Sequence, residues 1–294
     1  MEYAAGHRDT GLEPKPTLYV VATPIGNLRD IGLRALDVLK SVEIIAAEDT
    51  RVTARLLNHY EIRSKLTALH EHNEQRVASR LVEVLQRGGS VAVVSDAGTP
   101  AISDPGSRLV AAARAAGHPV VPIPGANAAV TALSASGWDA QHFLFYGFLA
   151  SRSAQRRAEL ASLARLPFVL VFYEAPHRVL ASVADMVQML GASRRVLIAR
   201  ELTKRFETLH ESTLEETGPW LEADPNQVKG ELVLLVAPAE ADAERETGEA
   251  EHVLAVLLEE LPLKQAVSLA TRLTSASKND LYARALKMRG EREL

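Results

Sequence analysis

The segment Val91–Gly106, with the sequence VAVVSDAGTPAISDPG, constrains the fold more than any other part of the chain. Its first four residues are wholly apolar and mostly β-branched, which is typical of a strand covered on both faces of a parallel sheet. A polar loop follows at once and contains Asp96, Gly98, Thr99, Ser103 and Asp104. Because open α/β sheets bind ligands beyond the carboxyl ends of their strands, this pattern predicts an α/β fold with a binding loop here. A long turn built from turn-forming residues is the alternative.

Two more strand-like runs end in loops of the same kind. The run 18–22 (LYVVA) leads into the turn 23–28 (TPIGNL). The run 118–123 leads into Pro-Gly-Ala-Asn at 124–127, which opens a helix of small residues that ends at Gly137. Small side chains at a helix start let a ligand approach closely, although tight packing of helix on sheet requires them too. The three loops together predict one binding site at one edge of a sheet.

The order of elements predicts two α/β domains. Strand-like runs at 18–22, 42–47, 65–69, 91–95 and 119–123 alternate with helical periodicity, which predicts a mostly parallel sheet over residues 17–137. Further strands are expected at 143–147, 168–173, 195–199, 207–211 and 232–237. Some of these lack a helix between them, so a mixed sheet is expected over residues 138–238. A chain of 294 residues is long enough for about two domains with their own cores.

The remaining segments differ in composition. Residues 1–16 are polar and are expected to form a disordered tail, and residues 239–251, with six acids and one Arg, an acidic linker. Helices are expected at 252–260, 263–272 and 278–287, the last capped by Ser277. Residues 261–294 carry seven Lys or Arg against three acids. We therefore expect a basic helix-turn-helix-like module over 252–294 whose basic face fits a phosphate backbone; a solvated cap is the alternative.

Composition also excludes several classes of site. The chain has no Cys, which excludes disulfides, thiolate metal sites and a Cys nucleophile. His70 and His72 lie at i, i+2 without a further ligand cluster, so no metal site is predicted. No signal peptide and no stretch of about 18 apolar residues occurs, which predicts a cytoplasmic protein without a membrane partner. The net charge of −4 leaves nucleic acid open as a partner, because a local basic face decides that.

Eight sequence blocks occur in order along the chain: LYVVATPIGNLRDI (18–31), AAEDTR (46–51), HEHNE (70–74), VVSDAGTPAISDPG (93–106), PIPGANAAVTALSASG (122–137), FYEAPHR (172–178), RELTKRFE (200–207) and KGELVLLV (229–236). Together they resemble the ribosomal RNA small subunit methyltransferase I family of the tetrapyrrole methylase superfamily. The resemblance implies two α/β domains of tetrapyrrole methylase type with S-adenosyl-L-methionine in the cleft between them, a small helical C-terminal module, and usually a homodimer. It also implies methyl transfer to the ribose 2′-hydroxyl of a cytidine in 16S ribosomal RNA, within the small ribosomal subunit.

Two departures from the wider superfamily bear on the substrate. Tetrapyrrole methylases typically carry a G-x-G-P-G-D-P loop after the first strand and Gly-Asp-Pro in the cofactor loop. This chain has ATPIGN at 22–27 and Gly-Thr-Pro at 98–100. Both departures are those of the ribosomal RNA branch. A tetrapyrrole methyltransferase is the alternative function, and a noncatalytic RNA-binding protein is a third.

The resemblance implies which residues hold the cofactor. Gly98, Thr99, Ile102 and Ser103 would hold its methionine and ribose portions, with Asn127 and Ala128 beside them. The remaining expected contacts, which shape the pocket or flank its loop, are Pro24, Ile25, Asp96 and Tyr173.

Methyl transfer to a hydroxyl requires two groups aligned about 3 Å apart and a proton acceptor. Candidate acceptors are Glu201 and the pair Glu48 and Asp49, which end the second strand beside Arg51. For Glu48 and Asp49, a structural ion pair with Arg51 is the alternative. Lys204 is expected to clamp an RNA phosphate or to steady the forming oxyanion, with a solvated strand end as the alternative.

Overall fold

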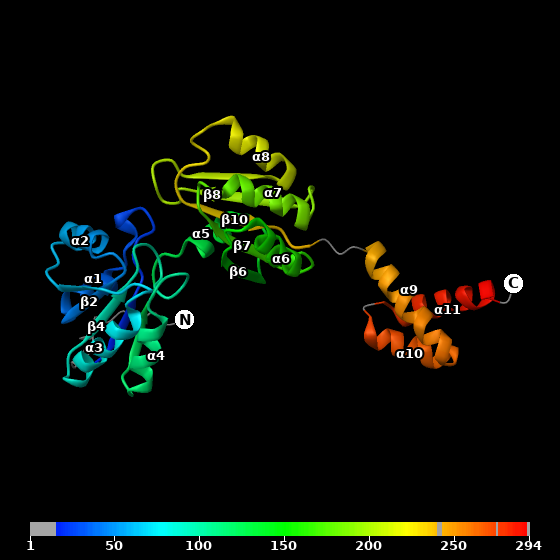
Figure 1. Ribbon diagram of the computed structural model, residues 1–294, viewed down its shortest axis with the longest axis horizontal. Helices are drawn as coiled ribbons and strands as arrows, with labels where there is room; N and C mark the ends of the chain where they lie inside the picture. Colours follow the sequence, from blue (N-terminus) through cyan, green and yellow to red (C-terminus); the bar gives the residue numbers. More distant parts are fainter. Residues whose placement is uncertain (1–15, 240–242, 275, 293–294) are drawn as a thin grey trace, which may run out of the picture. The chain divides into compact units, whose positions relative to one another are not determined.

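The computed structural model describes residues 16–239, 243–274 and 276–292, with side chains omitted at 243–249 and 289–292 (Figure 1). The expected tail, residues 1–16, lies outside this part apart from Pro16. One compact unit contains both sheets, and a second comprises Ala164–Phe168 with the chain from Pro238 onward.

The first sheet is wholly parallel, where a mostly parallel sheet was expected. Its strands are β1 (Leu18–Val21), β2 (Ile44–Ala47), β3 (Lys65–Ala68), β4 (Val91–Val94) and β5 (Val120–Ile123), in the order β3-β2-β4-β1-β5. Successive side chains of a strand point to opposite faces, so β4 contributes to two cores. This central position explains its unbroken apolar sequence.

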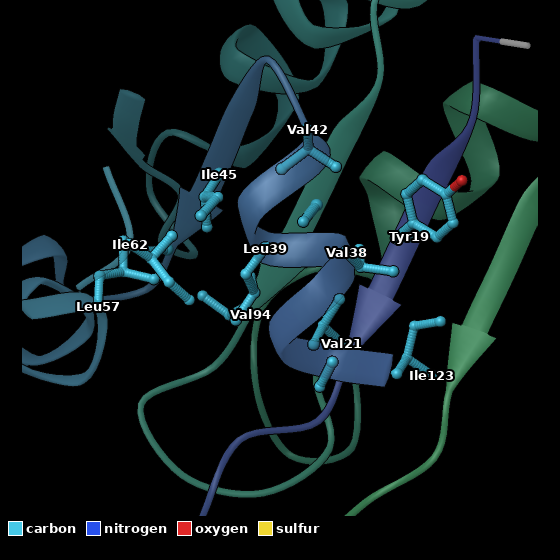
Figure 2. Packing of buried hydrophobic residues seen from close by; sticks show 13 residues of the cluster. Tyr19, Val21, Val38, Leu39, Val42, Ile45, Leu57, Ile62, Val94 and Ile123 are labelled. Atoms are coloured by element: carbon cyan, nitrogen blue, oxygen red, sulfur yellow. The ribbon is translucent and has the colours of Figure 1, made fainter. Parts of the chain in front are cut away.

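Helices cover both faces of this sheet. Val91 and Val93 pack with α3 (Glu74–Gln86) and α4 (Ser107–Ala115), whereas Ala92 and Val94 pack with α1 (Leu33–Ser41) and α2 (Thr50–His59). Figure 2 shows the second of these clusters, with Leu39 of α1 beside Val94. Two covered faces leave the strand ends as the open edge of the sheet.

The second sheet is mixed, as expected. Its strands are β6 (Phe143–Phe148), β7 (Val169–Glu174), β8 (Arg195–Arg200), β9 (Thr208–Thr213) and β10 (Leu232–Val236), in the order β6-β7-β10-β8-β9. Only β6 and β7 pair in parallel. Helices α6 (Ser153–Leu163), α7 (Val179–Leu190) and α8 (Leu214–Ala223) complete this half (Figure 1).

Helix α5 (Ala128–Ala135) lies within the segment expected for the first domain, but it packs on the second sheet. Its Ala129, Ala132 and Leu133 pack in one cluster with second-sheet residues, among them Val171, Leu197 and Val233. The helix follows the last strand of the first sheet but covers the second. Its small side chains allow the close approach that this requires. The two α/β domains, each built on one sheet, therefore lie together in one compact unit.

Within its described residues, the second unit contains three helices, α9 (Ala243–Glu260), α10 (Leu263–Leu273) and α11 (Lys278–Arg292). They share a core that includes Ala250, Leu254, Val267 and Leu281. The amide of Asp280 donates to the Ser277 hydroxyl at 3.2 Å, as expected of the cap. Helix α9 begins at Ala243, within the segment 239–251 that was expected as an acidic linker. The alanines and glutamates that suggest solvation also favour helix, and Ala250 is buried.

Candidate active site

A cavity of about 360 Å³ opens beyond the carboxyl ends of the first sheet's strands and is also lined by the second sheet. Among the residues expected at the cofactor, eight line it: Ile25, Gly98, Thr99, Ile102, Ser103, Asn127, Ala128 and Tyr173. Pro24 is buried and Asp96 half-buried, and neither belongs to the lining. Glu48, Glu201 and Lys204 also lie outside it. The structure thus gathers most of the expected cofactor residues, whereas the expected catalytic residues lie around the cavity.

The turn after β1 and the loop after β4 are joined by backbone hydrogen bonds. The Thr23 amide donates to the Gly98 carbonyl at 2.8 Å, and the Gly98 amide donates to the Thr23 carbonyl at 3.1 Å. Gly98 has φ +85°, and a Cβ there would lie 3.4 Å from Ile25 Cγ2. Glycine is therefore favoured here by its backbone conformation, and a Cβ would make an ordinary contact with Ile25.

Further along the same loop, Ala101 and Ser103 hold left-handed conformations, with φ of 66° and 65°. Such conformations cost about 1 kcal/mol or more for residues with a Cβ, and they concentrate at ligand clamps. The two residues flank Ile102, which is 42% exposed and lines the cavity. The strain thus supports a loop that presents side chains to a ligand.

The start of α5 forms another wall. Asn127 caps the helix, since its Oδ1 accepts from the amides of Ala129 at 3.0 Å and Val130 at 3.3 Å. The Tyr173 hydroxyl also accepts from the Ala129 amide, at 3.3 Å, and burial raises the pKa of Tyr173. The cap occupies the Asn127 oxygen, so its amide nitrogen is the group that can serve a ligand.

Three carboxylates, Glu48, Asp96 and Asp104, form what we call the acid corner. The Asp96 amide donates to Glu48 Oε2 at 3.4 Å, and Asp96 Oδ1 accepts from the Asp49 amide at 2.9 Å. Burial raises the pKa of Glu48 and that of Asp96. Burial and the charge of Glu48 raise the pKa of Asp104 to about 6. Asp104 lines the cavity but is not among the site residues expected from the sequence, although it lies in the polar loop that follows β4.

Asp49 behaves differently from Glu48. Its carboxylate pairs with Arg51 at 2.6 Å, and hydrogen bonds from that side chain and its amide lower the pKa of Asp49 to about 2. Asp49 also caps α2 by accepting from the Arg51 amide at 2.8 Å. The ion-pair alternative therefore holds for Asp49.

Glu201, Lys204 and Glu231 form what we call the lysine corner. Lys204 Nζ lies 2.7 Å from Glu201 Oε1 and 3.1 Å from Glu231 Oε2, and the Glu231 amide donates to Glu201 Oε1 at 3.0 Å. Burial opposes both charges, but these contacts outweigh it, so the pKa of Glu201 is lowered and that of Lys204 raised. A Cβ on Gly26 would lie 2.5 Å from Lys204 Cγ. Lys204 is thus held against the turn after β1 and is not a freely solvated strand end.

Among the other lining residues that were not expected from the sequence, Phe148 and Glu174 contribute an aromatic ring and a carboxylate. Glu174 is buried, with Oε1 3.3 Å from the Arg178 guanidinium, and it accepts from the Ser182 hydroxyl. Phe148 is 53% exposed, and its ring centroid lies 5.7 Å from that of Tyr173. Both stand at the carboxyl ends of strands, which is the signal that could have found them.

In the described part of the chain, no group of three or more His, Asp or Glu residues is placed to hold a metal ion. The rings of His70 and His72 lie 6.1 Å apart. No described helix combines the length and the apolarity needed to cross a membrane.

The fold and the cavity place the chain among the methylases of tetrapyrrole type. The family model described as "Tetrapyrrole (Corrin/Porphyrin) Methylases" matches residues 17–218. Among solved structures, a uroporphyrin-III-C-methyltransferase from Thermus thermophilus matches with a TM-score of 0.53 at 20% identity, covering 76% of this chain and 94% of that one. A cobalt precorrin-4 methyltransferase matches with a TM-score of 0.59 at 14% identity, covering 76% and 95%. These likenesses show the fold.

Sequence relatives define the branch. Proteins named "Ribosomal RNA small subunit methyltransferase I" are 50% identical in Pseudomonas aeruginosa over 94% of this chain and 98% of that one, and 50% identical in Escherichia coli O157:H7 over 93% and 96%. A model of the C-terminal helix-turn-helix domain of the same family matches residues 244–289. The chain belongs to the ribosomal RNA small subunit methyltransferase I family and is a methyltransferase.

Proposed function

We propose that this protein transfers a methyl group from S-adenosyl-L-methionine to the ribose 2′-hydroxyl of a cytidine in 16S ribosomal RNA, within the small ribosomal subunit. The observation that carries the proposal is the cavity, which joins an apolar slot to convergent polar groups at the edge of the first sheet. The name shared by the half-identical relatives supports ribosomal RNA as the substrate.

The residues of the cavity fit S-adenosyl-L-methionine. Its volume of about 360 Å³ lies in the range of small-molecule sites. Apolar side chains such as Ile25, Leu202 and Val233 suit a flat adenine, and Gly98 leaves room for it. Thr99, Ser103, Asn127, Asp104 and Tyr173 supply donors and acceptors for the ribose and amino-acid portions. When bound, the cofactor supplies a methyl group made electrophilic by a positively charged sulfur.

Pro24 and Asp96, the two expected cofactor residues outside the lining, would act on the cofactor indirectly. We assign Pro24 to the turn that sets Ile25 over Gly98. We assign Asp96 to the negative field of the acid corner behind Asp104. A cofactor with positively charged groups gains from that field.

The chemical work of the protein itself is to align the hydroxyl and to take its proton. Alignment can supply up to about 7–11 kcal/mol in favourable cases, so a strong base is not required. Glu48, whose pKa burial raises, is the better proton acceptor; Glu201, whose pKa is lowered, is the weaker one. We assign Lys204 to an RNA phosphate or to the developing oxyanion.

Mapping of methylated riboses tests the reaction. In 16S ribosomal RNA from cells without the gene, one cytidine 2′-O-methyl group is expected to be missing, and purified protein with S-adenosyl-L-methionine should restore it on small subunits. Methylation of uroporphyrinogen III with none of the RNA would instead establish the tetrapyrrole alternative.

The second unit is proposed to add RNA affinity but no chemistry. Its basic residues, among them Lys264, Arg272 and Lys278, can neutralise phosphates, and such contacts weaken steeply with salt. A chain that ends before Ala243 should bind the cofactor normally and bind RNA more weakly, with a shallower dependence on salt. Equal RNA affinity and equal salt dependence would refute this role.

We also propose a homodimer that works in the cytoplasm. Sedimentation of the purified protein at several concentrations tests the first point, and cell fractionation tests the second. A monomer at micromolar concentration would exclude the dimer.

A further inference from the structure

The loop between β8 and β9, residues 201–207, extends from the cavity to the protein surface. Near its start, Leu202 is buried and lines the cavity. Near its end, Phe206 is 64% exposed. An exposed hydrophobic side chain by itself is ordinary, so its surroundings decide whether it has a role.

Phe206 is held in place by its own backbone. Its carbonyl accepts from Arg200 Nη2 at 3.2 Å and from the Thr208 hydroxyl at 3.1 Å. The loop is closed by the Glu207 amide, which donates to the Lys204 carbonyl at 3.2 Å. A loop whose backbone is fixed in this way loses less conformational entropy when a ligand packs on its side chains.

Arg205 stands beside the ring, with its guanidinium carbon 5.5 Å from the ring centroid. Lys204 is bound by two carboxylates, whereas Arg205 forms no ion pair within the described residues. The loop therefore offers an available cation next to an exposed aromatic face. Proteins bind unpaired nucleotides with this combination, because the ring stacks on a base while the cation meets a phosphate.

The position of the loop relative to the cavity indicates which nucleotide Phe206 would contact. Leu202 is part of the cavity wall, and Lys204 lies against Gly26 in the turn after β1. An RNA strand whose ribose reaches the cavity must leave its helical stack, and a neighbouring base then needs a new stacking surface. We propose that Phe206, aided by Arg205, stacks on an unpaired base next to the methylated nucleotide. This inference rests on the proposed function.

Substitutions at Phe206 separate stacking from simple apolar contact. Phe206→Ala and Phe206→Leu should each raise the KM for small subunits that lack the methyl group by about 5- to 100-fold, the range that base stacking on an aromatic side chain supplies. Phe206→Trp should restore it. The kcat and the affinity for S-adenosyl-L-methionine should not change. Phe143→Ala is the matched control, since Phe143 is also exposed, at 43%, and lies at the start of β6.

Substitutions at Arg205 test the second half of the platform. Arg205→Ala should weaken binding and reduce the salt slope by about one, as expected when one phosphate contact is lost. Arg205→Lys should keep most of the slope, because the charge remains.

Direct binding separates this inference from the proposed function. A fluorescent ten-residue oligocytidylate, followed by anisotropy, reports on stacking whether or not methyl transfer occurs. If wild-type protein methylates no RNA, the proposed function fails, and the stacking is still judged by this binding. Equal affinity of wild type and Phe206→Ala, or full rescue by Phe206→Leu, overturns the inference. A change of oligomeric state in Phe206→Ala with unchanged RNA affinity also overturns it, in favour of a protein contact.

Discussion

The acid corner and the lysine corner both place carboxylates at strand ends, yet their charges are arranged in opposite ways. In the acid corner, Glu48, Asp96 and Asp104 lie close together, and burial raises the pKa of each. In the lysine corner, two glutamates share Lys204, and the pKa of Glu201 is lowered. The neighbouring charge, more than the place in the sheet, decides whether a carboxylate is ready to take a proton or is fixed as one half of an ion pair.

The largest effect is expected at Glu48. Glu48→Gln should lower turnover by about 10²–10⁴-fold with little change in cofactor affinity, because it removes the proton acceptor and keeps the shape. Single-turnover rates at saturating RNA, measured over about pH 6 to 9, check this. Glu201→Gln is the matched control and should cost less. A larger loss at Glu201 would reverse the comparison of the two corners.

The next effect concerns the loop that carries Asp104. Gly98→Val should lower the affinity for S-adenosyl-L-methionine by about 100-fold or more, since the new side chain would fill the slot under Ile25 and meet an unfavourable φ. Calorimetric titration measures it. Gly88→Val is the control for strain, because Gly88 has φ +92° and open space around its Cβ position. Comparable loss of cofactor binding in both variants would show that strain, and not the slot, is responsible.

A smaller effect is expected at the lysine corner. Lys204→Met keeps the alkyl chain against Gly26 and removes the charge, so the KM for RNA should rise about tenfold, as for one lost charged contact. If Lys204 is a pure phosphate clamp, the single-turnover rate recovers at saturating RNA; a persistent deficit would assign it to the oxyanion. The pKa of Glu201 should rise once this partner is gone, because burial is then opposed by fewer contacts.

The smallest effect is on stability. The fold raises the pKa of Asp104 to about 6, so the folded protein binds its proton more tightly than the unfolded chain does. Stability then decreases as the pH rises through the window between the ordinary Asp value and about 6. Asp104→Asn should therefore stabilise the protein at pH 7, by about 1 kcal/mol or a few degrees in Tm, with no gain below about pH 4.

Asp49→Asn should change the stability of the protein in the opposite direction. Its pKa is lowered to about 2, so its contribution to stability is present above the ordinary Asp value and is lost as the pH falls toward 2. This variant should lower Tm at pH 7. Thermal melts of both variants at pH 4 and pH 7 make the measurement. If both variants changed Tm in the same direction at pH 7, the contrast between Asp104 in the acid corner and the ion-paired Asp49 would be contradicted.

The sequence predicted the strands well because each is a short apolar or alternating run bounded by turn-formers. It predicted which loops line the cavity, because polar residues directly after a buried strand serve no packing need. The corners could not be predicted, since they depend on contacts distant in the chain, such as Asp96 with Asp49 and Lys204 with Glu231. The packing of α5 on the second sheet could not be predicted, because its small side chains form no amphipathic pattern that indicates which sheet it covers.

Helix α5 has a consequence for how the two sheets can be exchanged or separated. A chain divided after Gly137 would leave Ala129, Ala132 and Leu133 facing water on one fragment and bare the face of Val171 and Val233 on the other. Each fragment would therefore expose an apolar surface until it bound the other fragment. A chimera that joins the first sheet of one family member to the second sheet of another should therefore place its junction ahead of Asn127, so that the helix travels with the sheet it covers.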